Sequence, residues 1–201
     1  MRGIFPHFLA KARSERMPDT RERILEAART AFSEKGFDGV SVEEIAQRAG
    51  VRKALIYYYF PSKEILFEEI WNNALEELER HIFKEIENEN YYVKKIKRFL
   101  KAYIDFVTSR KVLSRVIERE RPAVLNTITD DSETTWSRLR ERYDTFVDKV
   151  AKLIEEGKEN HIVHPDVDSI AAAKLIAQVM SGSSATEAIQ TLILRGLMKE
   201  S

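Results

Sequence analysis

Hydrophobic positions recur three or four residues apart along most of the chain, with polar residues between them. This spacing predicts helices. Seven Gly and five Pro among 201 residues leave few of the turns that a β architecture needs. We therefore expect an all-α protein, whose helices cover residues 19–35, 41–49, 52–59, 61–88, 93–107, 112–121, 130–157, 166–181 and 184–199.

The stretch of residues 41–63 carries the most specific pattern. Ser41 and Glu44 have the spacing of a capping box, which fixes the start of a helix. Gly50 falls where a left-handed residue ends that helix, so a second short helix follows at a steep angle. This is the helix-turn-helix arrangement, whose second helix enters the major groove of DNA.

The outer side of the second helix suits contact with DNA. Ile56 and Phe60 fit the core, which leaves basic and aromatic side chains outside. Tyr58 is our first candidate for reading bases and Arg52 the second. The residues predicted to contact DNA are Ser41, Arg52, Lys53, Leu55, Tyr57, Tyr58 and Lys63.

Lys63 lies in the first turn of the next helix, where the helix dipole makes a lysine unfavourable. A bound anion resolves this conflict, because free N–H groups and a cation together form a phosphate site. We therefore predict that Lys63 holds a backbone phosphate of DNA.

A spaced set of residues within 19–66 is specific enough to indicate a family. The set comprises Phe37 to Val42, Ile45-Ala46, Ala49-Gly50-Val51, Ile56-Tyr57, Phe60 and Lys63 to Leu66. It closely resembles the DNA-binding domain of the tetracycline-repressor (TetR) family. At residues 52–55 the chain reads Arg-Lys-Ala-Leu where the family often has Ser-Lys-Gly-Thr, so the operator sequence does not carry over.

The pattern and the resemblance divide the chain into three parts. We expect a flexible N-terminal extension at 1–18, a three-helix helix-turn-helix domain at 19–64, and a helical effector-binding and dimerisation domain at 65–201. The extension is too interrupted for a signal peptide. It is either disordered or a basic arm that touches DNA, and Met17 is an alternative start.

Aromatic residues recur at helical spacing within residues 65–201, and such a pattern suits either a plain core or a ligand cavity. The resemblance implies a small apolar or amphipathic effector. We place its pocket among Trp71, Phe99, Tyr103, Trp136 and Tyr143.

The last two helices have more apolar surface than they need between themselves, and small residues permit close approach. The resemblance implies that they form a four-helix interface in a homodimer, whose two-fold symmetry suits a palindromic operator. The predicted interface residues are Ile170, Ala173, Ala177, Ser181, Ile189, Leu192, Ile193 and Leu197.

Charge and composition favour a DNA-binding protein over a metalloprotein, an enzyme or a membrane protein. The net charge is zero, but residues 1–63 hold twelve Lys and Arg against eight Asp and Glu, which suits local DNA contact. The absence of Cys fits a reducing cytoplasm. His161 and His164 lie in a predicted loop beside Pro165, so we expect no metal there. We find no pattern for a cofactor or an enzyme active site, and we expect no membrane partner.

These patterns lead to one hypothesis and two alternatives. We expect a homodimeric, DNA-binding transcriptional repressor that an effector releases from a palindromic operator. One alternative is an architectural or activating DNA-binding protein without an effector. The other is a helical ligand-binding module with a vestigial helix-turn-helix.

Overall fold

The computed structural model describes residues 19–127, 133–179 and 187–199. Regular structure in these residues is helical, apart from one antiparallel bridge between Val163 and Met198, which confirms the predicted all-α class. The helices are α1 (Thr20–Lys35), α2 (Val42–Ala49), α3 (Lys53–Tyr59), α4 (Lys63–Lys84), α5 (Tyr92–Ser109), α6 (Lys111–Asn126), α7 (Thr135–Glu159), α8 (Ser169–Val179) and α9 (Glu187–Leu197).

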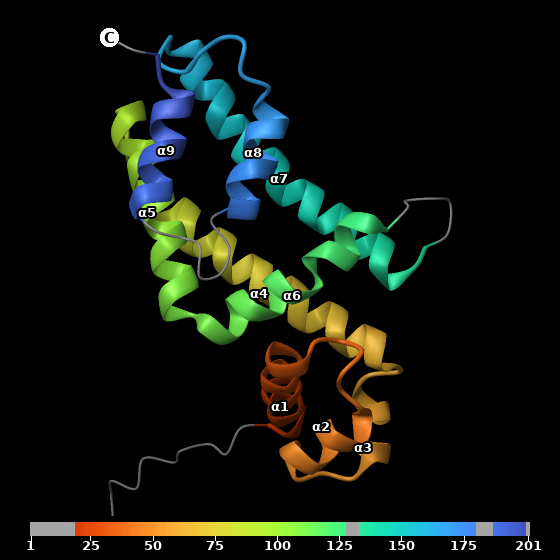
Figure 1. Ribbon diagram of the computed structural model, residues 1–201. Helices are drawn as coiled ribbons and strands as arrows, with labels where there is room; N and C mark the ends of the chain where they lie inside the picture. Colours follow the sequence, from red (N-terminus) through yellow and green to blue (C-terminus); the bar gives the residue numbers. More distant parts are fainter. Residues whose placement is uncertain (1–18, 128–132, 180–186, 200–201) are drawn as a thin grey trace, which may run out of the picture.

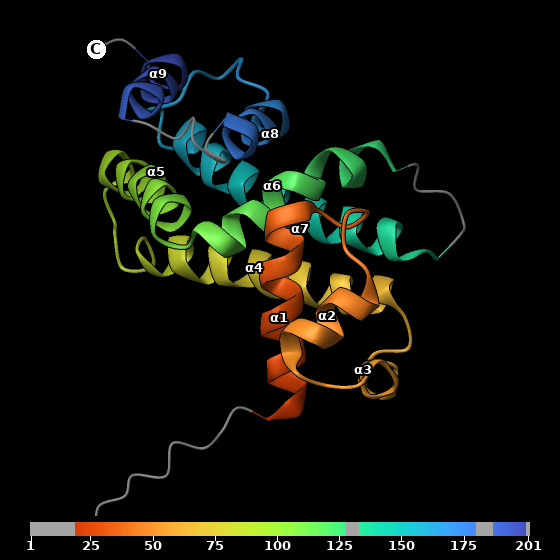
Figure 2. The ribbon, with the colours of Figure 1, turned by 60° about the horizontal axis from the view of Figure 1, so that its bottom comes forward.

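Helices α1, α2 and α3 group together at one end of the molecule, and α5 to α9 gather at the other (Figure 1). Helix α4 runs from the first group into the second, and α1 packs across α6 (Figure 2). Helix α8 packs along α7, and α9 contacts α5. Because α4 has 22 residues, it is about 33 Å long.

The helix-turn-helix forms largely as its sequence predicts. The Ser41 hydroxyl accepts a hydrogen bond from the Glu44 N–H at 3.1 Å. Gly50 is left-handed, with φ 64° and ψ 39°, and its N–H donates to the carbonyls of Ala46 and Gln47. The reciprocal half of the capping box differs, because the Glu44 carboxylate binds Lys35 and Arg48 instead.

Helix α1 begins where predicted, with Asp19 as its N-cap, although the Asp19 side chain makes no capping hydrogen bond. Helix α7 begins at Thr135 rather than at residue 130, because Thr134 and Ser137 form the capping box. The predicted start of the last helix at residue 184 lies outside the described residues.

Two residues expected to stop helices lie inside them. Helix α6 continues through Pro122 to Asn126, and Val124 is fully buried on its inner face. Helix α7 continues past Gly157 to Glu159. A Cβ at Gly157 would collide with the ring of Tyr92 and a methyl of Val163, so this glycine permits close helix packing instead of ending a helix.

Candidate nucleic-acid interface

Helix α3 is anchored by two buried side chains and presents the rest of its surface outward. Ile56 and Phe60 are each 1% exposed, which confirms the predicted inner face. Tyr57 is 44% exposed and Tyr58 is 79% exposed. Arg52, the N-cap of α3, is also exposed, and Leu55 is half-buried. The helix therefore offers polar and aromatic groups on an exposed face, and their DNA contacts stay predictions.

Arg52 and Lys53 differ in their surroundings. Lys53 pairs with the Glu43 carboxylate of α2, and its ammonium lies 5.7 Å from the centre of the Tyr57 ring. The hydrogen bond that Lys53 donates to Glu43 raises the pKa of Lys53 and lowers the pKa of Glu43. The Arg52 side chain has no ion pair or hydrogen bond with a described residue, and it is exposed.

Lys63 is held inside the fold. Its ammonium donates to the carbonyls of Phe37 at 2.8 Å and Val40 at 2.9 Å, and it lies 4.1 Å from the centre of the Phe37 ring. Two of its three donors thus fix the turn between α1 and α2. The predicted phosphate contact would rest on the third donor, and it stays a prediction.

Ser41 lies apart from α3, at the N-terminus of α2. Its hydroxyl oxygen accepts from Glu44, and the residue is exposed. The same hydroxyl can still donate outward, as an N-terminal helix residue facing a phosphate would.

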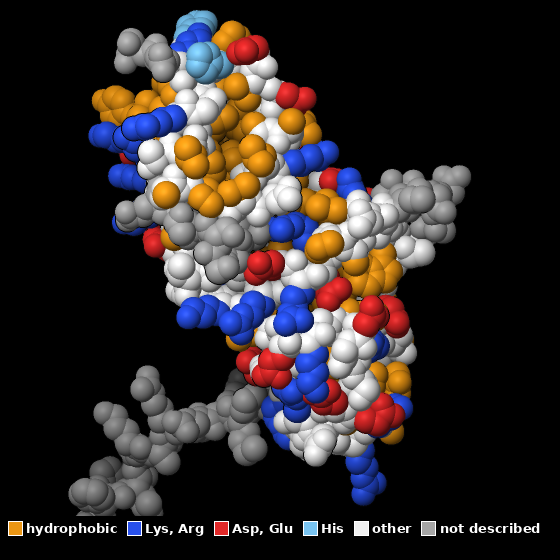
Figure 3. Space-filling model, in the orientation of Figure 1, with side chains coloured by type: hydrophobic (Ala, Val, Ile, Leu, Met, Phe, Trp, Pro, Cys, Tyr) orange, Lys and Arg blue, Asp and Glu red, His pale blue; other side chains and the backbone are white. Residues whose placement is uncertain are grey.

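Positive and negative charges are more evenly balanced in residues 19–63 than in residues 1–63 as a whole. Residues 19–63 contain eight Lys and Arg and seven Asp and Glu, so most of the basic excess lies in residues 1–18, outside the described part. Both signs are interspersed over α1 to α3 (Figure 3). Several cations are paired, for example Arg21 with Glu69 and Arg48 with Glu34.

The predicted pocket residues fall into two groups. Trp71, Phe99, Tyr103 and Tyr143 are buried in the core, and Phe146 lies between Tyr103 and Tyr143. Trp136 lies elsewhere, with its ring 5.4 Å from that of Phe37 and 5.8 Å from that of Phe67. The structure therefore does not bring these five aromatic residues around one space.

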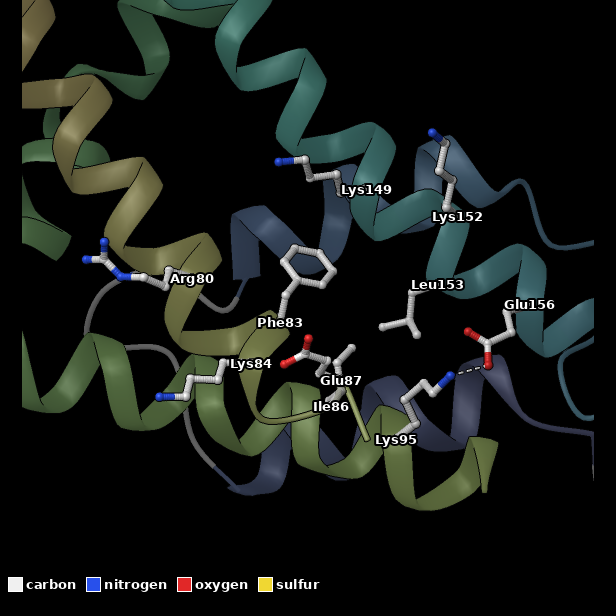
Figure 4. A pocket seen from close by; sticks show the side chains of 10 residues that line it. All are labelled: Arg80, Phe83, Lys84, Ile86, Glu87, Lys95, Lys149, Lys152, Leu153 and Glu156. Carbon is white, nitrogen blue, oxygen red and sulfur yellow. Dashed lines mark hydrogen bonds and ion pairs between the residues drawn. The ribbon is translucent and has the colours of Figure 1, made fainter. Parts of the chain in front are cut away.

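An open groove of about 690 Å³ lies between α4, α5 and α7 (Figure 4). Phe83, Ile86 and Leu153 supply its apolar surface. The other residues that line it are charged: Arg80, Lys84, Glu87, Lys95, Lys149, Lys152 and Glu156. Sequence reasoning missed this groove because it combines three helices. The only available signal was basic residues spaced three or four apart on α4 and α7.

Some of the predicted dimer residues are buried within the chain, and others are exposed. Ala173, Ala177 and Leu197 are buried within the chain, whereas Ile170 is 41% and Leu192 is 68% exposed. Ile189 and Ile193 are half-buried, and Ser181 lies outside the described residues. Leu175, which the sequence prediction omitted, is 57% exposed. Apolar side chains gather on the face over α8 and α9 (Figure 3).

The described residues contain neither a cluster of metal-ligating side chains nor a helix that could cross a membrane. Within 19–127, 133–179 and 187–199, no three His, Cys, Asp or Glu side chains gather in a way that could hold a metal ion. His161 is exposed and His164 half-buried. None of the described helices is both long and apolar enough to cross a membrane.

The chain is similar to known bacterial regulators. Residues 24–70 match the model of the bacterial regulatory proteins of the tetR family. The biofilm operon negative transcriptional regulator IcaR of Staphylococcus aureus strain Newman is 26% identical over 138 residues, which cover 69% of this chain and 71% of IcaR.

Solved structures share the fold over nearly their full length. PfmR of Thermus thermophilus, a TetR family transcriptional regulator, is 26% identical, with a TM-score of 0.69 over 92% of this chain and 100% of PfmR. AibR, solved with isovaleryl coenzyme A and operator DNA, is 20% identical, with a TM-score of 0.71 over 90% of this chain and 98% of AibR.

The helix-turn-helix and its exposed α3 define a DNA-binding transcriptional regulator. Residues 24–70 thus carry the tetR-family match, and the chain as a whole is similar to TetR-family regulators in sequence and fold.

Proposed function

We propose that this protein is a homodimeric transcriptional repressor that a small apolar or amphipathic effector releases from a palindromic operator. The observation that carries the proposal is the geometry of α3, where buried Ile56 and Phe60 hold exposed Arg52, Tyr57 and Tyr58 toward solvent. The relative IcaR, a negative regulator, supports repression. The protein acts in the cytoplasm, and we assign it no catalytic activity.

A second copy of the chain completes the DNA-binding unit in this proposal. The exposed apolar side chains Ile170, Leu175 and Leu192 on α8 and α9 support pairing through these helices. Two-fold symmetry would present two α3 helices to half-sites about 34–36 Å apart, or a multiple of that distance.

The effector would bind in the part of the chain after residue 64. The groove between α4, α5 and α7 supports an amphipathic ligand, because apolar Phe83 and Leu153 lie among basic side chains. The buried aromatic core around Trp71 and Tyr143 is the alternative location, provided that it opens. AibR was solved with an acyl coenzyme A, which is an amphipathic molecule. Native mass spectrometry of protein purified from its host would detect a bound effector.

Footprinting on the DNA around the protein's own gene, with and without cell extract, tests the proposal. We expect a protected site with two-fold symmetry that extract weakens. Lys53→Ala should weaken binding to all sequences and reduce the slope of log K against log salt by about one. Lys152→Ala, which removes an exposed charge on α7, is the matched control and should leave the slope unchanged.

Base reading needs a separate measurement. Tyr58→Ala should alter the methylation-interference pattern of the protected site, because this side chain is the most exposed aromatic group of α3. An unchanged pattern would remove Tyr58 from base reading. The absence of any protected site would contradict the DNA-binding function itself.

A further inference from the structure

Three helices beyond α1 meet at one residue of the turn between α1 and α2. The Phe37 N–H donates to the Glu120 carboxylate of α6 at 2.7 Å. The Phe37 carbonyl accepts from Lys63 of α4 at 2.8 Å. Its ring packs edge-on against Trp136 of α7. This turn is therefore bound to parts of the chain that lie far from it in sequence.

Gly36, the residue before Phe37, leaves room for the Glu120 carboxylate. Gly36 has φ 75°, a conformation that disfavours side chains. A Cβ at this position would lie 2.8 Å from the Glu120 Oε1 atom. Gly36 therefore supplies both the backbone turn and the space that lets Glu120 reach the Phe37 N–H.

The position of α2 follows from the position of this turn. Ser41, the N-cap of α2, comes four residues after Phe37, and Lys63 also holds the intervening Val40 carbonyl. Helix α3 then packs against α2. Any shift of the turn relative to α6 therefore shifts α2 and α3 together.

The hydrogen bond that the Phe37 N–H donates to Glu120 is well suited to fix the position of the turn. It joins a charged acceptor to a backbone N–H at a partly buried site, and such hydrogen bonds are stronger than neutral ones. Helix α6 also packs across α1, so the carboxylate is held on a helix that is itself packed against this domain. Glu120 belongs to α6 and is not among the residues predicted above to contact DNA.

We propose that Glu120 is a positioning residue for DNA binding, which acts through the Phe37 N–H to set the separation of the two α3 helices in a dimer. The proposal rests on the proposed function, because it requires a two-fold operator. One base pair changes the distance between half-sites by about 3.4 Å and also rotates one relative to the other. A loosened turn would therefore tolerate altered spacings.

The test compares variants on three versions of the protected site: the natural spacing and spacings longer and shorter by one base pair. The variants are Glu120→Ala, Glu120→Gln, Glu120→Asp and the control Glu118→Ala, which removes a charge from the same helix. The Glu118 side chain has no ion pair or hydrogen bond with a described residue. Affinities are measured by titration, below the melting temperature of each variant.

We expect Glu120→Ala to reduce the discrimination between natural and altered spacings by about fivefold or more, a change of about 1 kcal/mol by the usual conversion. Glu120→Gln should keep most of the discrimination, because its amide oxygen still accepts from Phe37, although a neutral acceptor makes a weaker bond. Glu120→Asp keeps the charge but is too short, and should behave as Glu120→Ala. The salt slope should stay unchanged in all variants, because no phosphate contact is lost.

Three results would overturn the inference: equal loss of affinity on all spacings, which indicates a merely structural role; a Glu120→Gln variant that behaves as Glu120→Ala; or a changed salt slope. If Glu120→Ala does not fold, the contrast between Glu120→Gln and Glu120→Asp decides the question. Failure of the wild-type protein to protect any site would instead contradict the proposed function.

Discussion

The two ends of α4 differ in how they are joined to the neighbouring helices. At its N-terminal end, polar side chains join α4 to other helices: Lys63 to the turn after α1, Glu68 to Arg138 of α7, and Glu69 to Arg21 of α1. At its C-terminal end, Arg80 and Lys84 line an open groove without an ion pair to a described residue. The DNA-proximal end is therefore fixed by directional bonds, and the far end leaves charge and space available.

The packing beneath each end differs in the same way. Near the N-terminal end, Phe32, Phe37, Phe67 and Trp136 form an aromatic cluster around the polar bonds. Beyond the C-terminal end, α5 and α7 approach closely at Gly157, where the buried Tyr92 hydroxyl has no partner among the described residues. We expect the first region to be sensitive to lost contacts and the second to added volume.

The largest expected effect comes from Phe67→Ala, which removes the ring at the centre of the aromatic cluster. Phe67 is fully buried, so the substitution should lower the free energy of unfolding by about 3–5 kcal/mol. Denaturant unfolding measures this. The control is Ile65→Ala on the same helix, where the side chain is 37% exposed and the loss should be much smaller. Equal losses would contradict a tightly packed junction.

Gly157→Ala tests the far region by adding a single methyl group. The new Cβ would collide with the Tyr92 ring and a Val163 methyl, and we expect a loss of about 1–3 kcal/mol from overpacking. Gly196→Ala in α9 is the matched control, because nothing lies within 4 Å of its Cβ position. That control should stabilise the protein by about 0.5–1 kcal/mol through helix propensity. A neutral Gly157→Ala would show that α5 and α7 separate easily.

Lys63→Met and Lys84→Met compare the two ends of α4 directly. Each keeps an apolar stem and removes the ammonium. Lys63→Met leaves the Phe37 and Val40 carbonyls without their partner, which should cost about 1–2 kcal/mol. Lys84→Met should change stability by less than about 0.5 kcal/mol, because the residue is exposed. Similar unfolding midpoints for the two variants would contradict the inference that polar bonds stabilise the N-terminal end of α4 more than the C-terminal end.

The smallest effect at neutral pH is expected for Tyr92→Phe, because the hydroxyl makes no bond with a described residue that the variant would lose. Its effect should appear in alkali. Burial, and then the charge of Glu156, raise the pKa of Tyr92 above its ordinary value. The folded state then keeps a proton that the unfolded state loses, so stability falls as pH rises above about 10.

Tyr92→Phe should make that decline shallower by up to about 1.4 kcal/mol per pH unit. Urea unfolding at pH 7 and at several values above 10 measures the change. An identical pH dependence in wild type and variant would mean that the phenol reaches solvent in the folded protein.

Local features of the structure were predictable from sequence, and contacts between distant residues were not. The cap at Ser41, the left-handed Gly50 and the inward Ile56 depend on neighbours within one helical turn, where spacing carries the information. The bond between Phe37 and Glu120 joins residues 83 positions apart, and no helical period reports it.

The same limit explains the candidate sites. Tyr57 and Tyr58 were predicted to be exposed because the face of a short helix follows from its period. Trp136 lies beside Phe37 and Phe67, a position that depends on how α7 crosses α4 and that the spacing within one helix does not report. Lys63 was identified as a notable cation, but its two carbonyl partners become visible only once α1 and α4 are packed.

The bridge between Val163 and Met198 has a consequence for association. With the Lys199 N–H bonded to the Ile162 carbonyl at 2.9 Å, it joins the end of α9 to the segment that follows α7. The exposed Leu192 thus stands on a helix whose end is already ordered in the single chain. A partner that covers this face has less conformational entropy to remove, so its affinity should depend mainly on how well the apolar surfaces match.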